Sequence, residues 1–65
     1  MHLMRLDEVM KATGLGRSSI YKQMYLGQFP RQVSIGGRAV AWVSDEVGAW
    51  VADRINQRDS EGSRP

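Results

Sequence analysis

The sequence predicts a small α+β fold in which two short helices and a tight turn precede a two-stranded hairpin and a third helix. Three observations carry this prediction. Apolar residues recur with helical spacing before residue 27 and after residue 44, the period between them changes to two, and a Gly-Gly pair divides the alternating stretch. A chain of 65 residues without cysteine is at most one small domain, and its apolar core must stabilise it without disulfides.

The first helix is predicted over residues 7–13. One helical face is marked by four residues at spacing i, i+3, i+4 and i+7, namely Leu6, Val9, Met10 and Thr13. Asp7 and Glu8 fall in the first turn, where the helix dipole favours negative charge. Gly14 follows, and glycine suits the left-handed residue that ends many helices.

The second helix is predicted over residues 17–26, after a turn in which Gly16 serves as the N-cap. Ile20 and Met24 lie four residues apart and face the core. The opposite face is polar, cationic and free of acids, and it holds Ser18, Ser19, Lys22 and Gln23. Gly27 ends the helix.

A hairpin is predicted around Gly36-Gly37, because such a pair accepts positive φ at both turn positions. A two-residue turn there pairs Ile35 with Arg38, Val33 with Val40, and Arg31 with Trp42. That register places four apolar residues on one face, namely Val33, Ile35, Val40 and Trp42. Arg38 then lies at the tip of the hairpin.

The third helix is predicted over residues 45–57, with Ser44 as its N-cap and Asp45 and Glu46 in its first turn. Its apolar stripe consists of Val47, Trp50, Val51 and Ile55. Gly48 inside the helix costs about 1 kcal/mol relative to alanine, so we expect close packing there. Both tryptophans, Trp42 and Trp50, lie on apolar faces and are predicted to be core residues.

The order helix, turn, helix, hairpin, helix is that of a winged helix-turn-helix domain, predicted over residues 1–57. Residues 58–65 have no apolar side chain and are expected to form a disordered polar tail. A short strand at residues 3–5 is a further expectation, and His2 is expected to be a solvated terminal residue.

The net charge of +2 conceals a segregation of charge along the chain. Residues 9–44 contain no acid and five cations, which are Lys11, Arg17, Lys22, Arg31 and Arg38. The acids lie in residues 7–8 and 45–61. A cationic segment of this length is a candidate contact surface for a polyanion.

Several classes of protein are disfavoured by the residue inventory. An enzyme is not expected, because the chain has no cysteine and its single histidine lies next to the N-terminus. We expect no cofactor and no metal site. The longest apolar run, residues 39–43, is too short to span a membrane, and residues 1–10 do not resemble a signal peptide. These features predict a cytoplasmic protein.

Several blocks of the sequence resemble the AlpA-type phage regulators, which are related in fold to the excisionases and to the DNA-binding part of the MerR family. The matching blocks lie within residues 5–55 and are Arg5-Leu6-Asp7-Glu8-Val9, Thr13-Gly14-Leu15-Gly16-Arg17-Ser18-Ser19-Ile20-Tyr21, Phe29-Pro30, Gly36-Gly37-Arg38-Ala39-Val40-Ala41-Trp42 and Glu46-Val47-Gly48-Ala49-Trp50. The resemblance implies a small winged-helix regulator that binds DNA, with a recognition helix starting at Arg17 and a wing arginine at Arg38. Gly16 departs from the family, which usually has serine there.

The first functional hypothesis is a sequence-specific protein for double-stranded DNA, either a phage or prophage-type transcriptional regulator or an excisionase-like recombination directionality factor. A helix can enter the major groove, and a glycine-rich hairpin tip can approach the neighbouring backbone. The candidate DNA-binding residues are Arg17, Ser18, Ser19, Tyr21, Lys22, Gln23, Gly37 and Arg38. Tyr25 is ambiguous, Lys11 is an alternative charge partner for the end of the first helix, and Arg31 is an alternative partner for an acid of the third helix.

The partners expected under this hypothesis are double-stranded DNA and either an integrase or RNA polymerase, with no membrane. The protein is expected to be a monomer or to self-associate weakly on DNA. The second hypothesis is a small adaptor that docks on an integrase or host factor through the apolar stripe of the third helix. Burial of that stripe by the rest of the fold would remove the adaptor surface.

Overall fold

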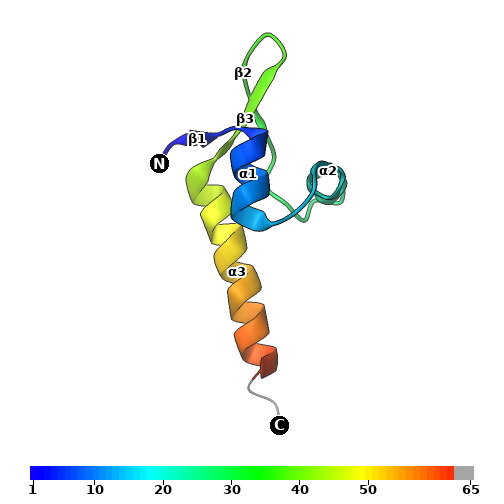
Figure 1. Cartoon of the computed structure of the whole chain (residues 1–65), viewed down its shortest axis with the longest axis vertical. Helices are drawn as coiled ribbons and strands as arrows, with labels where there is room; N and C mark the ends of the chain where they lie inside the picture. Colours follow the sequence, from blue (N-terminus) through cyan, green and yellow to red (C-terminus); the bar gives the residue numbers. More distant parts are fainter. Residues whose placement is uncertain (63–65) are drawn as a thin grey trace.

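The computed structural model describes residues 1–62, which form three helices and a three-stranded antiparallel sheet. The elements in chain order are β1 (Leu3–Met4), α1 (Leu6–Thr13), α2 (Arg17–Tyr25), β2 (Val33–Gly36), β3 (Ala39–Val43) and α3 (Ser44–Gly62). The hairpin of β2 and β3 projects from one end of the molecule, and α3 extends from the opposite end (Figure 1). The predicted fold class, a small α+β winged helix-turn-helix, is confirmed.

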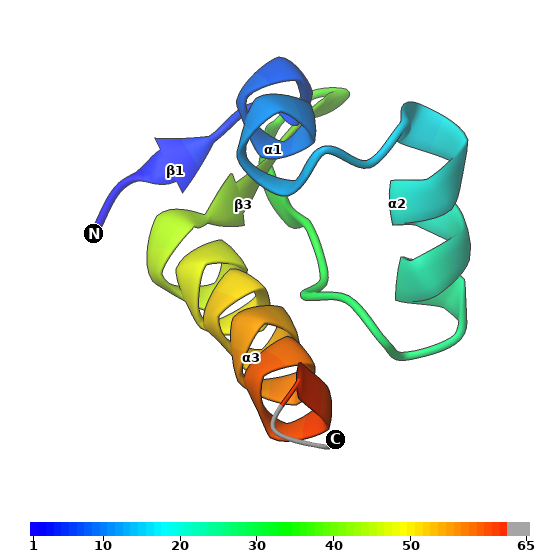
Figure 2. The same cartoon turned by 60° about the horizontal axis from the view of Figure 1, so that its bottom comes forward.

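The helix-turn-helix forms at the predicted residues, and Figure 2 shows its short connection between α1 and α2. Gly14 ends α1 with φ of 74°, in the left-handed region, and donates its backbone N–H to the Met10 carbonyl oxygen at 2.8 Å. Gly16 occupies the N-cap position of α2 in an extended conformation. The turn between the two helices therefore follows from its two glycines.

One hydrophobic cluster holds the elements together. It contains one or more buried residues from every helix, from β3 and from the segment between α2 and β2, namely Val9, Ile20, Phe29, Trp42 and Val47. The inward faces predicted for α1 and α2 are confirmed by the burial of Val9 and Ile20. Phe29, in the segment that connects α2 to β2, is buried as well.

The two tryptophans differ in burial. Trp42 is fully buried, and its indole N–H donates to the Pro30 carbonyl oxygen at 3.1 Å. Trp50 is only half-buried at the edge of the core, where its indole N–H donates to the Gln28 carbonyl oxygen at 2.8 Å. Both indoles thus fix the segment that returns from α2 to the sheet.

The predicted register of the hairpin is wrong by one residue. Val33 lies opposite Ala41 and Ser34 opposite Val40, while Gly36 pairs with Ala39, so Ile35 occupies an irregularity in the ladder. The turn is centred on residues 37–38 instead of the Gly-Gly pair. Gly36 and Gly37 have φ of 122° and 54°, and this freedom allows the irregularity beside the turn.

The predicted apolar face of the hairpin is wrong in β2 only, because Val40 and Trp42 of β3 do pack in the core. Val33 is 40% and Ile35 is 43% exposed, because the hairpin extends beyond the body of the domain (Figure 1). Buried residues lie instead next to each other in the central strand β3, where Ala41 and Trp42 are both fully buried. Helices and neighbouring strands cover this part of β3.

The third helix is longer than predicted. It continues to Gly62 instead of ending near residue 57, so residues 58–62 of the expected disordered tail are helical. Extension of an existing helix adds one hydrogen bond per residue, and residues 58–61 contain no helix breaker. Arg54 also donates to the Gln57 side chain at 3.3 Å, which supports the last turns. Residues 63–65 of the predicted tail lie outside the described residues.

Two expectations about α3 need correction. A Cβ placed on Gly48 meets no atom within 4 Å, so the close packing expected there is absent. Ser44 was expected to be the N-cap, but it is the first helical residue of α3. Its hydroxyl oxygen accepts the backbone N–H of His2 at 2.8 Å.

The expected N-terminal strand is present as β1, which pairs with β3 by placing Leu3 opposite Val43 and Met4 opposite Trp42. The His2 imidazole is 67% exposed and lies 3.8 Å from the Glu8 carboxylate, so the side chain is largely solvated as expected.

Candidate nucleic-acid interface

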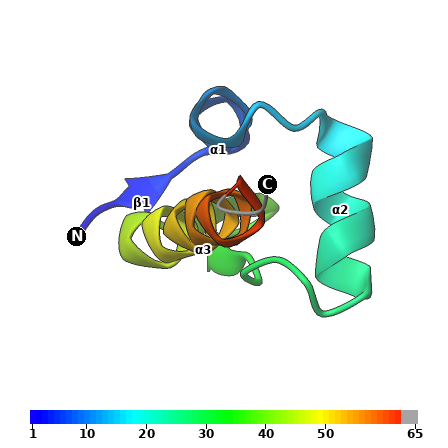
Figure 3. The same cartoon turned by 90° about the horizontal axis from the view of Figure 1, so that it is seen from below.

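Helix α2 presents a polar, exposed face on the side away from the core. Ile20 is fully buried, and this fixes the rotation of the helix. Ser18, Ser19 and Lys22 are consequently exposed, and Ser19 and Lys22 also border the cleft between α2 and α3. Figure 3 shows that no other element covers this outer side of α2. The three residues therefore lie where the sequence placed them.

The first turn of α2 also orients Arg17 and Tyr21. Tyr21 is half-buried, and its ring packs edge-on against the Trp42 ring with 6.3 Å between centroids. The exposed Arg17 guanidinium lies 5.9 Å from the Tyr21 ring centroid. This cation–π contact holds a positive charge beside the outer face of the helix.

Gln23 departs from its predicted place on the exposed face. It is half-buried in a cleft between α2 and α3, and its Oε1 atom is buried without a hydrogen-bond partner. The cleft is also lined by Trp50 and Arg54 of α3. Residue 23 lies 100° round the helix from residue 22, and this rotation brings it to the side that faces α3.

The wing carries the second part of the candidate surface. Gly37 and Arg38 form the exposed turn between β2 and β3. The positive φ of Gly37 matches a turn whose first central residue is glycine, so Arg38 keeps an ordinary negative φ. The wing turn lies at one end of the molecule (Figure 1), and Arg38 within this turn is exposed.

The cations of residues 9–44 form no ion pair with any acid in residues 1–60. Among the residues whose side chains the structure describes, 1–60, Arg58 forms an ion pair with Asp59, and the His2 imidazole lies 3.8 Å from the Glu8 carboxylate. Neither pair involves the basic segment. Its five cations, Lys11, Arg17, Lys22, Arg31 and Arg38, are all exposed. The surface of α2 and the wing is therefore electropositive.

Tyr25, which the sequence left ambiguous, is a further candidate contact residue. Its side chain is 90% exposed at the end of α2, three residues after Lys22 and seven after Ser18. This spacing puts Tyr25 on the same outer face. The helical period alone is therefore sufficient to place Tyr25 on this face.

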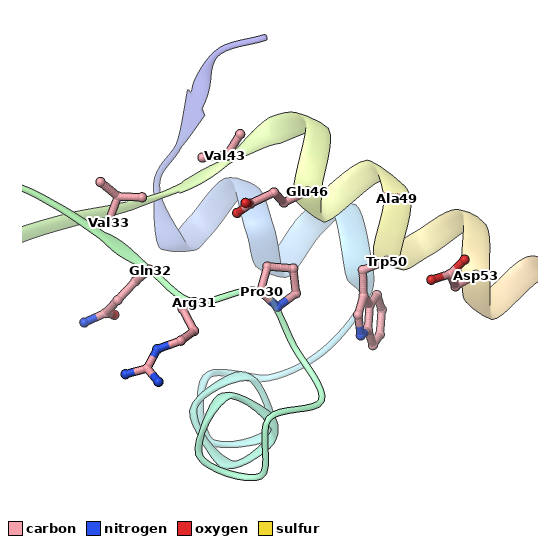
Figure 4. Close-up of a pocket in the computed structure, with 9 residues that line it drawn as sticks. All are labelled: Pro30, Arg31, Gln32, Val33, Val43, Glu46, Ala49, Trp50 and Asp53. Carbon is pink, nitrogen blue, oxygen red and sulfur yellow. The ribbon is translucent and has the colours of Figure 1, made fainter.

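The acids of α3 border a different hollow. Figure 4 shows a groove of about 690 Å³ between residues 30–33 and α3, with Glu46 and Asp53 on the α3 side. Arg31 also lines this groove, but its guanidinium points away from both carboxylates. The alternative pairing of Arg31 with an acid of α3 is therefore not seen.

The fold and this surface define a small winged helix-turn-helix protein with unpaired cations on the second helix and the wing. No helix in residues 1–62 has the length and apolar character needed to cross a membrane. A family model described as "Prophage CP4-57 regulatory protein (AlpA)" matches residues 2–55. The chain therefore belongs to this family of phage regulatory proteins, and the resemblance found in the sequence is confirmed.

Two known proteins are similar to this chain. The chain is 53% identical over 55 residues to "Uncharacterized protein ORF88" of Enterobacteria phage P4, a match that covers 85% of this chain and 62% of the phage protein. It is 28% identical over 60 residues to "DNA-binding transcriptional activator AlpA" of Escherichia coli strain K12, with 83% of this chain and 86% of AlpA covered. The chain thus spans less than two thirds of the length of the phage P4 relative.

Proposed function

We propose that this protein is a sequence-specific regulator that binds double-stranded DNA. The observation that carries the proposal is the exposed, acid-free surface formed by α2 and the wing, on which Lys22 and Arg38 have no acidic partner among residues 1–60. An α-helix fits the major groove of B-DNA, and cations beside it neutralise backbone phosphates. The similarity to an AlpA protein described as a DNA-binding transcriptional activator supports the same function.

In the proposed complex, α2 enters the major groove and the wing contacts the flanking backbone. Ser18, Ser19 and Lys22 face base edges and phosphates, since all three side chains are exposed on α2. Arg17 anchors the start of the helix to the backbone. Gly37 allows the wing backbone to approach a phosphate closely, because no side chain separates the two.

The regulator acts either on transcription, with RNA polymerase as its protein partner, or on recombination, as a directionality factor beside an integrase. The printed description of AlpA favours the transcriptional role. A single module of this size makes a small contact with DNA and binds weakly by itself. Monomers that associate weakly when bound to adjacent sites would compensate for this.

The direct test is a gel-shift titration with DNA from the region upstream of the gene and from a neighbouring attachment site. About four to six phosphate contacts should give a steep fall of log K with log salt, with a slope of about −4 to −5. If all these fragments still migrate as free DNA in micromolar protein, the proposal is contradicted.

The adaptor alternative is less well supported by the burial of α3. Val47 is 1% exposed, while Trp50 and Val51 are half-buried, so only Ile55 of the four stripe residues is exposed, at 45%. A pull-down without DNA distinguishes the two functions. An Ile55→Asp substitution should abolish capture of a protein partner only if the adaptor hypothesis is correct.

A further inference from the structure

A small pocket lies between α2 and the segment that returns from α2 to the wing. Its lining residues are Tyr21, Met24, Tyr25 and Arg31, and its volume is about 300 Å³. The residues that line the pocket include one arginine, two tyrosines and no acid. No intramolecular hydrogen bond of the tyrosine hydroxyls or of the Arg31 guanidinium occurs in the described part of the chain. Their donors are therefore free for an external acceptor.

Arg31 is directed toward this pocket although acids lie nearby. It shares the groove of Figure 4 with Glu46 and Asp53, yet its guanidinium points away from them, toward the α2 side. An arginine placed between acids and an acid-free pocket usually pairs with the acids, because opposite charges attract at short range. The observed direction leaves its positive charge next to the two tyrosines.

The surroundings fix the pocket in place. Tyr21 is held by its edge-on contact with Trp42, and Arg31 directly follows Pro30, whose carbonyl oxygen accepts the Trp42 indole N–H. Both walls of the pocket are thus attached to the same buried residue. Tyr25, by contrast, is 90% exposed and free to adapt to a ligand.

We propose that this pocket binds a backbone phosphate of DNA, with Arg31 as the cation and the tyrosine hydroxyls as further donors. The inference rests on the proposed function and adds a contact between those of α2 and those of the wing. A guanidinium beside neutral donors matches the geometry of a phosphate, which has several acceptor oxygens and a negative charge. Arg31 leads directly into β2, so the same strand links this contact to the wing turn.

The test uses fluorescence anisotropy with the full chain and a labelled 30-bp duplex of mixed sequence, at several salt concentrations between about 0.05 and 0.2 M. Each phosphate contact contributes about 0.9 to the slope of log K against log salt. Arg31→Gln should lower the magnitude of the slope by about 0.9 and weaken binding about eightfold at 0.1 M salt. Tyr25→Ala should weaken binding while leaving the slope unchanged, because it removes no charge.

Two comparison variants separate this contact from other effects. Arg58→Gln on α3 removes the same charge from an exposed position paired with Asp59, so its slope should equal that of the unmodified protein. Lys22→Gln on the outer face of α2 should lower the slope, as the proposed function requires. If Arg31→Gln has the same salt slope as Arg58→Gln while Lys22→Gln has a reduced slope, the pocket proposal alone is overturned.

Other outcomes are equally decisive. A lower melting temperature of Arg31→Gln with an unchanged slope would assign the residue to the stability of the fold and overturn the inference. If the unmodified protein binds neither this duplex nor any sequence from a random pool, the proposed function and the pocket proposal are both overturned.

Discussion

The ring of Tyr21 packs edge-on against the ring of Trp42, with 6.3 Å between the centroids and 71° between the planes. This contact joins α2 directly to β3, the inner strand of the wing. Because Trp42 is fully buried, the position of α2 relative to the wing is set by the core. The two elements proposed to contact DNA are thus positioned by one shared residue.

Trp42→Ala should destabilise the protein by about 3–5 kcal/mol, the usual effect of removing a large buried aromatic side chain. A small domain has a stability of only about 5 kcal/mol, so the variant should keep at most about 2 kcal/mol and be partly unfolded at room temperature. Urea unfolding followed by circular dichroism measures the change. Tyr25→Ala, at a position that is 90% exposed, is the control and should shift stability by less than about 0.5 kcal/mol.

Alanine should have opposite effects at two glycines. Gly48→Ala in α3 should raise the free energy of unfolding by about 0.5–1 kcal/mol, because the added Cβ meets no atom within 4 Å and alanine favours the helix. Gly14→Ala should lower it by about 1–2 kcal/mol, since its φ of 74° suits glycine. Thermal unfolding of both variants checks the prediction, and destabilisation by Gly48→Ala would show that the site is closely packed.

Gln23→Leu should raise the free energy of unfolding by about 1 kcal/mol. The buried Oε1 atom has no hydrogen-bond partner, and a lone buried acceptor costs about 1–3 kcal/mol. Because the side chain lies in the cleft toward α3, affinity for DNA should change by less than about twofold. Chemical unfolding and a DNA titration of the same variant test both expectations; a large loss of affinity would restore Gln23 to the contact surface.

Arg38→Ala should weaken binding to DNA about eightfold at 0.1 M salt, the value of one phosphate contact, with little change in melting temperature. The side chain is exposed at the wing turn and has no acidic partner in residues 1–60. Arg58→Ala provides the matched loss of charge. Unchanged affinity of Arg38→Ala would show that the wing arginine is merely solvated.

The helical elements were predictable because their signals are local. Gly14 and Gly16 mark the turn of the helix-turn-helix, and the spacing of Val9 and Ile20 with their neighbours marks the buried faces. The hairpin was predicted with the right strands and the wrong register. An irregularity at Ile35 shifts the pairing by one residue. The alternation of apolar residues cannot reveal this bulge, because the exposed Val33 and Ile35 alternate in the same way as residues of a half-buried strand.

The candidate site was predictable in part. Ser18, Ser19 and Lys22 are exposed on α2 as expected, because one strongly buried residue fixes the rotation of a short helix. The burial of Gln23 depends on where α3 packs, which is a tertiary property. The direction of Arg31 also depends on tertiary structure, since α2 and α3 lie on its two sides.

The central claim is that α2 and the wing together form the DNA-binding surface. Titration of the 15N-labelled protein with a short duplex, followed by amide chemical shifts, tests it most directly. The largest shifts should fall in residues 17–25 and 36–38, with Arg31 added if the pocket binds a phosphate, and α3 beyond residue 50 should change little. Shifts concentrated in α3, with α2 and the wing unaffected, would contradict the account.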